Sequence, residues 1–292
     1  MNNTIISILA GLGGMVGWGT SDFFANNASE KVGHTKTFFW SQMAGMLGMG
    51  VLFLIFKPVM TGMKEREREI VLLLIASVLY TIGYLYFYKA FEIGNVSVVS
   101  AAINLNTIIA IILAYIFLGQ RLTGFQIPAI VLVIAGIILV SINFNDLHKN
   151  GFSLLIGVKE TIIASLAFGI FWNLSQTLSE SIGWIPLTFF VKVISIILMI
   201  GISVISKKEK LFENNVKKYL PVIAIVGLLE AFAVASVNFG LSIGELVIVT
   251  PISSALSVVT ISLAVIFLKE KISKTQFVGI VMTIGGIVMS AF

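Results

Sequence analysis

The chain has 292 residues, of which 58% are hydrophobic and 11% are charged, and it carries a formal net charge of +5 at pH 7. Its mean hydropathy is +1.03, which excludes a soluble domain of this size because such a domain needs far more charge on its surface. The sequence contains no cysteine, which excludes disulfides, iron–sulfur clusters and thiol catalysis.

Apolar runs of about twenty residues, the length that crosses a bilayer as a helix, recur along the whole chain. They predict an all-α integral membrane protein with ten transmembrane helices. In chain order, the expected spans are 4–26, 37–56, 70–91, 95–118, 124–142, 155–177, 184–206, 220–241, 245–268 and 275–292. The first run lacks the basic residues that begin a signal peptide, so we expect it to be a retained span.

The second half of the chain repeats the first at a constant offset of 150 residues. Between 94–142 and 244–292, fourteen of the forty-nine aligned pairs are identical, without a gap. We therefore expect two five-helix repeats, 1–142 and 151–292, joined by a linker over 143–150. Because five is an odd number of spans, the second repeat must enter the membrane from the opposite side. Such an inverted repeat is typical of secondary transporters.

Lys and Arg residues in the loops indicate how a membrane protein is oriented, and in this chain they give two conflicting indications. The basic loop 57–69 lies on the N-terminal side of the membrane and favours a cytoplasmic N-terminus, whereas the sum over all loops favours an external one. No aromatic-and-basic RNA-binding motif accompanies these charges. The excess of positive charge therefore bears on membrane orientation, and we expect no nucleic-acid partner.

One carboxyl group, that of Glu230, lies about ten residues into the eighth span, near the middle of the membrane. An ionisable group at this depth costs about 3 kcal/mol or more unless it is paired or hydrated. Glu230 shares a helix face with Val234 and Asn238. The aligned residues of the third span are Tyr80, Tyr84 and Tyr88. Glu230 therefore binds a cationic substrate or a coupling proton, or it is a structural carboxyl group hydrogen-bonded between helices.

A second ionisable group, Lys192, lies eight residues into the seventh span and aligns with Gln42 of the second span. It has three possible roles: pairing with Glu230, contacting a substrate carboxylate, or extending its four-carbon stem to the membrane interface. The sequence slightly favours the interface, because a lysine side chain is long enough to reach it.

The first span has a polar and aromatic face of its own. Trp18, Asp22 and Asn26 follow one another at i, i+4 and i+8, and the aligned residues are Phe168, Trp172 and Gln176. Asp22 is expected about one turn from the end of this span. There it either gates the mouth of a cavity or lies among the lipid headgroups.

The spans contain further polar residues and a glycine pair. Asn104 in the fourth span and Ser254 in the ninth either bind ligand or make interhelical hydrogen bonds. Gly13 and Gly17 form a small-xxx-small face, which predicts close packing of the first span against another helix. Lys159–Glu160, at the start of the sixth span, is expected to be an interfacial ion pair.

Three short segments resemble those of a known family. They are Gly17-Trp18-Gly19, Tyr88-Lys89-Ala90-Phe91 and Phe117-Leu118-Gly119-Gln120-Arg121-Leu122. With the repeat, they make the chain resemble the ten-helix, EamA-type members of the drug/metabolite transporter superfamily over essentially its full length. The resemblance implies two inverted halves around a central cavity that opens alternately to each side, with both termini in the cytoplasm. Two positions depart from the family pattern: Ala101 stands where the second repeat has Pro251, and Gln120 replaces an expected glutamate.

From the residues and the resemblance together, we expect a secondary transporter of a small polar metabolite, such as an amino acid, a nucleobase or an amine. Export by alternating access is the expected mode, with proton coupling as one option. The alternatives are a membrane-embedded enzyme, for which no catalytic constellation is visible, and a channel or scaffold. A channel would repeat one short selectivity segment, whereas this chain repeats a whole five-helix unit.

The residues predicted to bind substrate are Trp18, Asp22, Tyr80, Tyr84, Tyr88, Asn104, Trp172, Lys192, Glu230, Asn238 and Ser254. We expect no catalytic residue, no cofactor and no metal ion. The expected partners are the small-molecule substrate, the lipid bilayer and protons. The protein is predicted to be a monomer in the plasma membrane.

Overall fold

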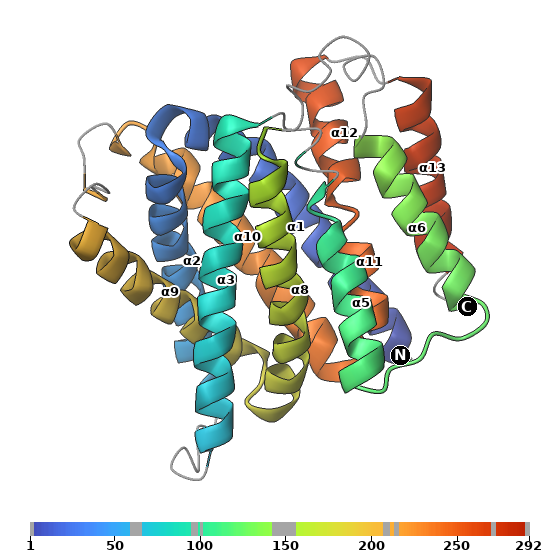
Figure 1. Cartoon of the computed structure of the whole chain (residues 1–292), viewed down its shortest axis with the longest axis horizontal. Helices are drawn as coiled ribbons and strands as arrows, with labels where there is room; N and C mark the ends of the chain where they lie inside the picture. The colour runs from blue at the N-terminus through green and yellow to red at the C-terminus, as the bar shows by residue number, and fades with distance from the viewer. Residues whose placement is uncertain are drawn as a thin grey trace.

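The computed structural model describes residues 3–58, 66–94, 99, 102–141, 156–206, 211–212, 216–269 and 273–289, and the regular secondary structure of these residues is helical (Figure 1). The helices are α1 Asn3–Val32, α2 His34–Phe56, α3 Glu67–Ile93, α5 Leu105–Phe117, α6 Gln126–Ser141, α8 Val158–Ser181, α9 Trp184–Ser206, α10 Leu220–Ile243, α11 Leu246–Ser253, α12 Leu256–Leu268 and α13 Lys274–Met289. The predicted linker, 143–150, lies outside the described residues.

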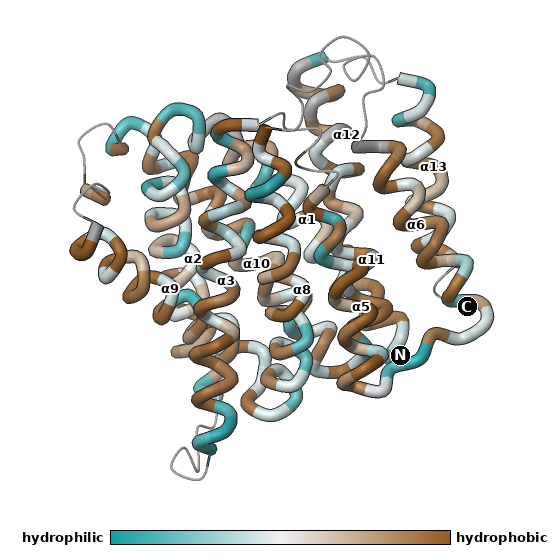
Figure 2. The backbone as a smooth tube through the Cα atoms, in the orientation of Figure 1, coloured by the Kyte–Doolittle hydropathy of each residue, from teal (hydrophilic) through white to brown (hydrophobic). Residues whose placement is uncertain are grey.

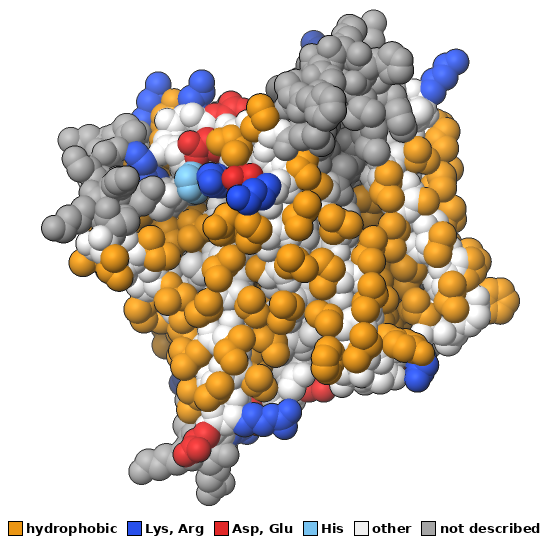
Figure 3. All heavy atoms as spheres, viewed as in Figure 1, with side chains coloured by type: hydrophobic (Ala, Val, Ile, Leu, Met, Phe, Trp, Pro, Cys, Tyr) orange, Lys and Arg blue, Asp and Glu red, His pale blue; other side chains and the backbone are white. Residues whose placement is uncertain are grey.

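The ten predicted spans are confirmed. Within the described part of the chain, seven helices are long and apolar enough to cross a membrane, when α11 and α12 are counted as one. The remaining three spans are the shorter apolar helices α5, α6 and α13. Hydrophobic side chains cover the middle of the face shown in Figure 3, and charged side chains lie towards its two ends. Figure 2 shows the same distribution along the backbone.

The predicted end of the first span is wrong. The helix continues to Val32 instead of ending near residue 26, and it stops at Gly33, whose φ of 91° favours glycine. The aligned Gly183, with φ 88°, follows the end of α8 in the same way. Because α1 continues past Asp22 for ten more residues, Asp22 lies well inside the helix and far from its end.

The two repeats are inverted with respect to each other. In Figure 1, α1 rises from the N-terminus, and its counterpart α8 runs in the opposite direction. Packing between the halves has the same symmetry: α1 packs on α10, α8 packs on α3, and α6 packs on its own counterpart α13. When the repeats are exchanged, the α1–α10 contact maps onto the α8–α3 contact and the α6–α13 contact maps onto itself. This is the relation that a pseudo-two-fold axis in the membrane plane produces.

Glycines allow the closest of these helix contacts. A Cβ atom added at Gly17 would lie 2.8 Å from the Cβ of Ala233, and one added at Gly13 would clash with the side chain of Ser236. The small-xxx-small face predicted on the first span therefore packs against α10. Gly136 and Gly286 serve the α6–α13 contact in the same way, each lying close to the backbone of the other helix.

The fourth and ninth spans are both broken, and at aligned positions. In the ninth, α11 ends at Ser253, and Ser254 has φ −70° and ψ −11°. In the fourth, the aligned Asn104 precedes α5 with φ −65° and ψ −10°. Hydrogen bonds between residues three apart, such as Asn106 N to Ile103 O at 3.0 Å and Ala255 N to Ile252 O at 3.1 Å, tighten both breaks. Only the second repeat has a proline in this region, so the break does not depend on proline.

Candidate functional site

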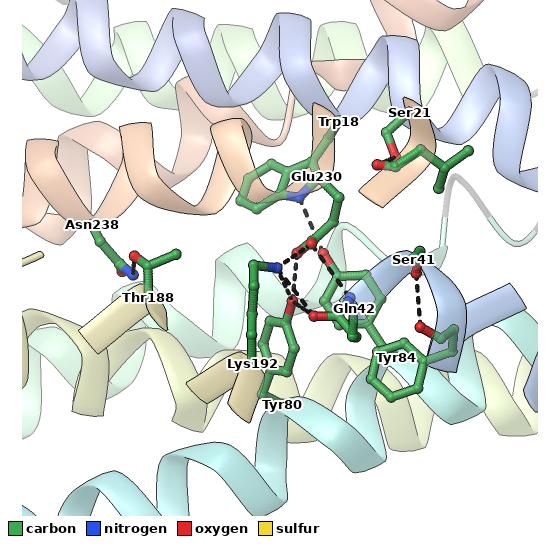
Figure 4. Close-up of polar contacts among 12 residues, drawn as sticks. Trp18, Ser21, Ser41, Gln42, Tyr80, Tyr84, Thr188, Lys192, Glu230 and Asn238 are labelled. Carbon is green, nitrogen blue, oxygen red and sulfur yellow. Dashed lines mark hydrogen bonds and ion pairs between the residues drawn. The ribbon is translucent and has the colours of Figure 1, made fainter. Parts of the chain in front are cut away.

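A buried polar cluster lies at the centre of the bundle (Figure 4). Its members come from four helices: Gln42 from α2, Tyr80 from α3, Lys192 from α9 and Glu230 from α10. Lys192 Nζ forms an ion pair with Glu230 Oε2, and the Tyr80 hydroxyl donates a hydrogen bond of 2.5 Å to Glu230 Oε1. Lys192 Nζ also donates to Gln42 Oε1 at 3.1 Å. The cluster is therefore compensated in charge and internally hydrogen-bonded.

The position of Lys192 corrects the sequence-based preference for the membrane interface. Its side chain is fully buried, with a relative exposure of 0%, and that of Glu230 is 1% exposed. The interface lies out of reach because the helix face that bears Lys192 points into the bundle, where the Glu230 carboxylate meets it. A lysine stem can follow apolar surface to water, but here the nearer opposite charge determines where it lies.

The cluster is built from two pairs of residues at aligned positions of the repeats. Gln42 and Lys192 are 150 residues apart and in contact, and so are Tyr80 and Glu230. A residue can contact its own repeat equivalent only near the axis that relates the repeats. The Glu230 cluster, defined as these four residues, therefore marks the pseudo-two-fold axis inside the bundle.

A cavity of about 50 Å³ lies beside this cluster. Its lining residues are Trp18, Asp22, Tyr84, Phe87, Ile103, Asn104, Asn106, Phe168, Trp172, Thr250, Ser253, Ser254 and Leu256. They come from α1, α3, α8, and the broken fourth and ninth spans. Six of the predicted site residues line it, namely Trp18, Asp22, Tyr84, Asn104, Trp172 and Ser254. Phe87 and Asn106 were not predicted, because neither spacing nor alignment with a polar partner distinguishes them in the sequence. Thr250 was not predicted either, although its alignment with Ser100 at the repeat offset was a signal that could have found it.

Aromatic rings form one wall of the cavity. The rings of Trp18 and Trp172 meet edge to face, with centroids 5.4 Å apart and planes at 66°. Tyr84 and Phe168 pack in the same way at 5.0 Å and 80°. The indole nitrogen of Trp18 donates a hydrogen bond of 3.1 Å to the Tyr84 hydroxyl, which ties the two pairs together. This wall is therefore rigid and presents both ring faces and ring edges.

Polar groups also line the cavity, at the two helix breaks. Asn104 and Ser254 occupy aligned positions of the two repeats, and both line the cavity. The Ser254 hydroxyl is hydrogen-bonded to that of Thr107 on α5, so the breaks of the two repeats touch here. Irregular backbone inside a membrane protein is tolerated where it is buried in protein or lines a cavity.

Asp22 is the one charged side chain that lines the cavity among the described residues. It is 8% exposed, and it has no hydrogen bond or ion pair with any residue that the structure describes. Glu230 is close enough to act on it electrostatically. Of the two positions considered for Asp22, the structure favours the cavity over the headgroups, because α1 carries this residue into the bundle.

The remaining predicted site residues lie elsewhere. Asn238 donates a hydrogen bond of 2.9 Å to Thr188 Oγ1 on α9, away from the Glu230 cluster (Figure 4). Tyr88 is buried and packs edge to face on Phe38 and Tyr84. Glu160 forms an ion pair with Lys89, at 3.2 Å, and Lys159 acts on it electrostatically as well. The sequence predicted only the interaction with Lys159.

The sequence pattern of the EamA-like transporter family matches residues 5–142 and, a second time, residues 155–292. The chain therefore belongs to the EamA-like transporter family, with one match to each repeat.

Two further comparisons agree with the repeat and the fold. An uncharacterized protein of Methanocaldococcus jannaschii is 31% identical over 139 residues, which are 97% of that protein and 47% of this chain. That relative therefore corresponds to about one repeat. A solved crystal structure, described only as that of a protein, superposes with a TM-score of 0.77 at 13% identity and covers 97% of both chains. Likeness at this level of identity concerns the fold alone.

Proposed function

We propose that this protein is a secondary transporter of a small polar metabolite and that the cavity between the two broken spans is its transport site. The observation that carries the proposal is the meeting of the repeats there: Asn104 and Ser254 occupy aligned positions, and both line the cavity. Inverted repeats with broken helices at their interface are the arrangement in which transporters hold their cargo near the middle of the membrane.

The proposed mechanism is alternating access, in which one repeat rocks against the other. A cavity of about 50 Å³ is far smaller than the roughly 300–1,000 Å³ of typical small-molecule sites, so a substrate does not fit in this conformation. A substrate requires the walls to separate, on one side of the membrane and then on the other. The Glu230 cluster lies near the pseudo-two-fold axis and joins the halves through Lys192–Gln42 and Tyr80–Glu230. We propose that it acts as the fixed point of this motion.

The Glu230 cluster also bears on proton coupling. The sequence suggested that Glu230 itself exchanges protons during transport. However, Glu230 is outside the lining of the cavity and already has Lys192 as its counter-charge. We therefore propose that any coupling proton binds at Asp22, which lines the cavity and is not paired with a described residue.

Site-directed labelling tests the mechanism without knowledge of the substrate. The chain contains no cysteine, so a Ser254→Cys variant carries a single thiol, and this thiol lies in the cavity. In vesicles, a membrane-impermeant maleimide should label it when added to either side, because the cavity opens to each in turn. Ile197→Cys is the matched control, since that side chain is 60% exposed on the outside of α9 and should face lipid. Labelling of Ser254→Cys from one side only would contradict alternating access.

A further inference from the structure

We propose that the substrate is an organic monocation, an amine with an aromatic or alkyl body, and that Asp22 is the residue that binds its positive charge. This inference rests on the proposed function, since it takes the cavity as the transport site, and it adds the chemical class of the cargo.

The first argument concerns charge. A carboxylate that is removed from water requires an opposite charge or several hydrogen bonds. The other buried carboxylate of the site, Glu230, has Lys192, Tyr80 and Gln42 as partners. Asp22 is 8% exposed, lines the cavity, and has no such partner among the described residues. A cationic ligand would supply the missing counter-charge.

The second argument concerns the aromatic wall. Trp18, Tyr84 and Trp172 line the cavity together with Asp22, and Phe87 and Phe168 complete the wall. The electron-rich faces of indole and phenol rings attract ammonium groups, and Trp attracts them most strongly. The edge-to-face packing of Trp18 on Trp172 turns ring faces in more than one direction. A carboxylate next to aromatic rings can therefore bind the ammonium group of an amine, while the rings contact the apolar part of the same molecule.

The third argument excludes a substrate whose carboxylate must be bound. None of the described residues that line the cavity is Lys, Arg or His, and the nearby Lys192 is already bonded to Glu230 and Gln42. The helix breaks offer little to an anion either. The backbone N–H groups of Asn106 and Thr107 already donate to the carbonyls of Ile103 and Asn104. An amino acid would therefore place its carboxylate where no positive group meets it.

A set of matched phenyl compounds tests the proposal by binding to the purified protein in nanodiscs, measured by calorimetry. Phenethylamine carries the ammonium group alone, phenylalanine adds a carboxylate, and 2-phenylethanol carries no charge. We expect phenethylamine to bind at least tenfold more tightly than either of the others. Asp22→Asn should weaken phenethylamine at least thirtyfold, whereas Asp22→Glu should retain most of the binding.

Glu30→Gln is the matched control, because it removes the same charge from an exposed position of the same helix, and it should bind like the unmodified protein. Thermal melting of Asp22→Asn must match that of Asp22→Glu, which separates lost binding from lost folding. Equal binding of phenylalanine and phenethylamine, or binding of phenethylamine that is unchanged in Asp22→Asn, would overturn the proposal. So would the absence of phenethylamine binding. In each case, the labelling of Ser254→Cys from both sides decides separately whether the cavity is a transport site.

Discussion

Tyr80 and Glu230 occupy the same position in the two repeats, and the hydroxyl of one donates a hydrogen bond of 2.5 Å to the carboxylate of the other. Gln42 and Lys192 are related in the same way. Identical residues at such positions would face each other across the axis, and two glutamates or two lysines there would repel. The two repeats instead carry complementary residues, so the axis holds one ion pair and its hydrogen bonds.

The first prediction concerns this ion pair. Lys192→Met should destabilise the protein by about 3–5 kcal/mol, because Glu230 would remain buried without its counter-charge. The double variant Lys192→Met/Glu230→Gln should recover most of that loss, since no uncompensated charge remains. Denaturation midpoints in detergent, compared as a double-mutant cycle, measure both effects. A single variant as stable as the unmodified protein would show that the pair is not a structural element of the axis.

The second prediction compares two glycines. A Cβ atom added at Gly227 on α10 would lie 2.0 Å from the backbone oxygen of Ser41 on α2, and that backbone cannot move aside cheaply. Gly227→Ala should therefore cost about 1–3 kcal/mol or prevent folding. Gly201→Ala is the control, because nothing lies within 4 Å of its added Cβ, and it should be neutral or stabilise α9 by up to about 1 kcal/mol. Equal melting temperatures of the two variants would contradict the tight α2–α10 contact.

The third prediction concerns Pro251. Because the first repeat breaks at Asn104 without a proline at the aligned position, Pro251→Ala should leave the break at Ser254 in place. The labelling of Ser254→Cys from both sides should then be unchanged within about twofold. Loss of labelling in Pro251→Ala would mean that the ninth span had become continuous and that proline determines its break after all.

The fourth prediction concerns pH. A cation and a proton that compete for Asp22 cannot occupy it together, so binding of phenethylamine should weaken as the pH falls. The titratable groups that face Asp22 are Glu230, Tyr84 and Tyr88. Glu230→Gln should retain the pH dependence, whereas Asp22→Asn should abolish it along with tight binding. Calorimetric titrations over a pH series provide the comparison. If the pH dependence of binding persists in Asp22→Asn and disappears in Glu230→Gln, Glu230 and not Asp22 binds the coupling proton.

The ten spans, the inverted repeats and the family could be predicted from the sequence because they depend on local features. Apolar runs of membrane-spanning length and a constant offset are visible without knowledge of how the helices cross. The cavity wall was predicted in part for the same reason, since Trp18, Asp22 and Trp172 follow helical spacing and aligned positions.

What the sequence could not supply is the distance of each residue from the axis. Glu230 and Asn238 share a helix face, but eight residues of helix carry Asn238 about 12 Å along α10, where it meets Thr188 instead. Lys192 was assigned to the interface because the sequence shows the length of the lysine side chain but does not show that Glu230 lies next to it. Asp22 was expected about one turn from the end of the first span because the apolar run ends at residue 26, whereas α1 continues to the turn at Gly33.

The central claim is that the cavity opens between the two repeats, and a reversible lock tests it most directly. Thr107 and Ser254 belong to different repeats and are hydrogen-bonded to each other beside the cavity, so cysteines at both positions can form a disulfide in a chain that has no other thiol. Four tryptophans are present, and replacing Trp40 and Trp184 by Phe leaves Trp18 and Trp172, which line the cavity. The measurement is quenching of their fluorescence by acrylamide. We predict strong quenching in the reduced protein, at least threefold weaker quenching after oxidation, and full recovery with reductant. Equal quenching in the oxidised and reduced states, with the disulfide confirmed by mass spectrometry, would contradict the claim.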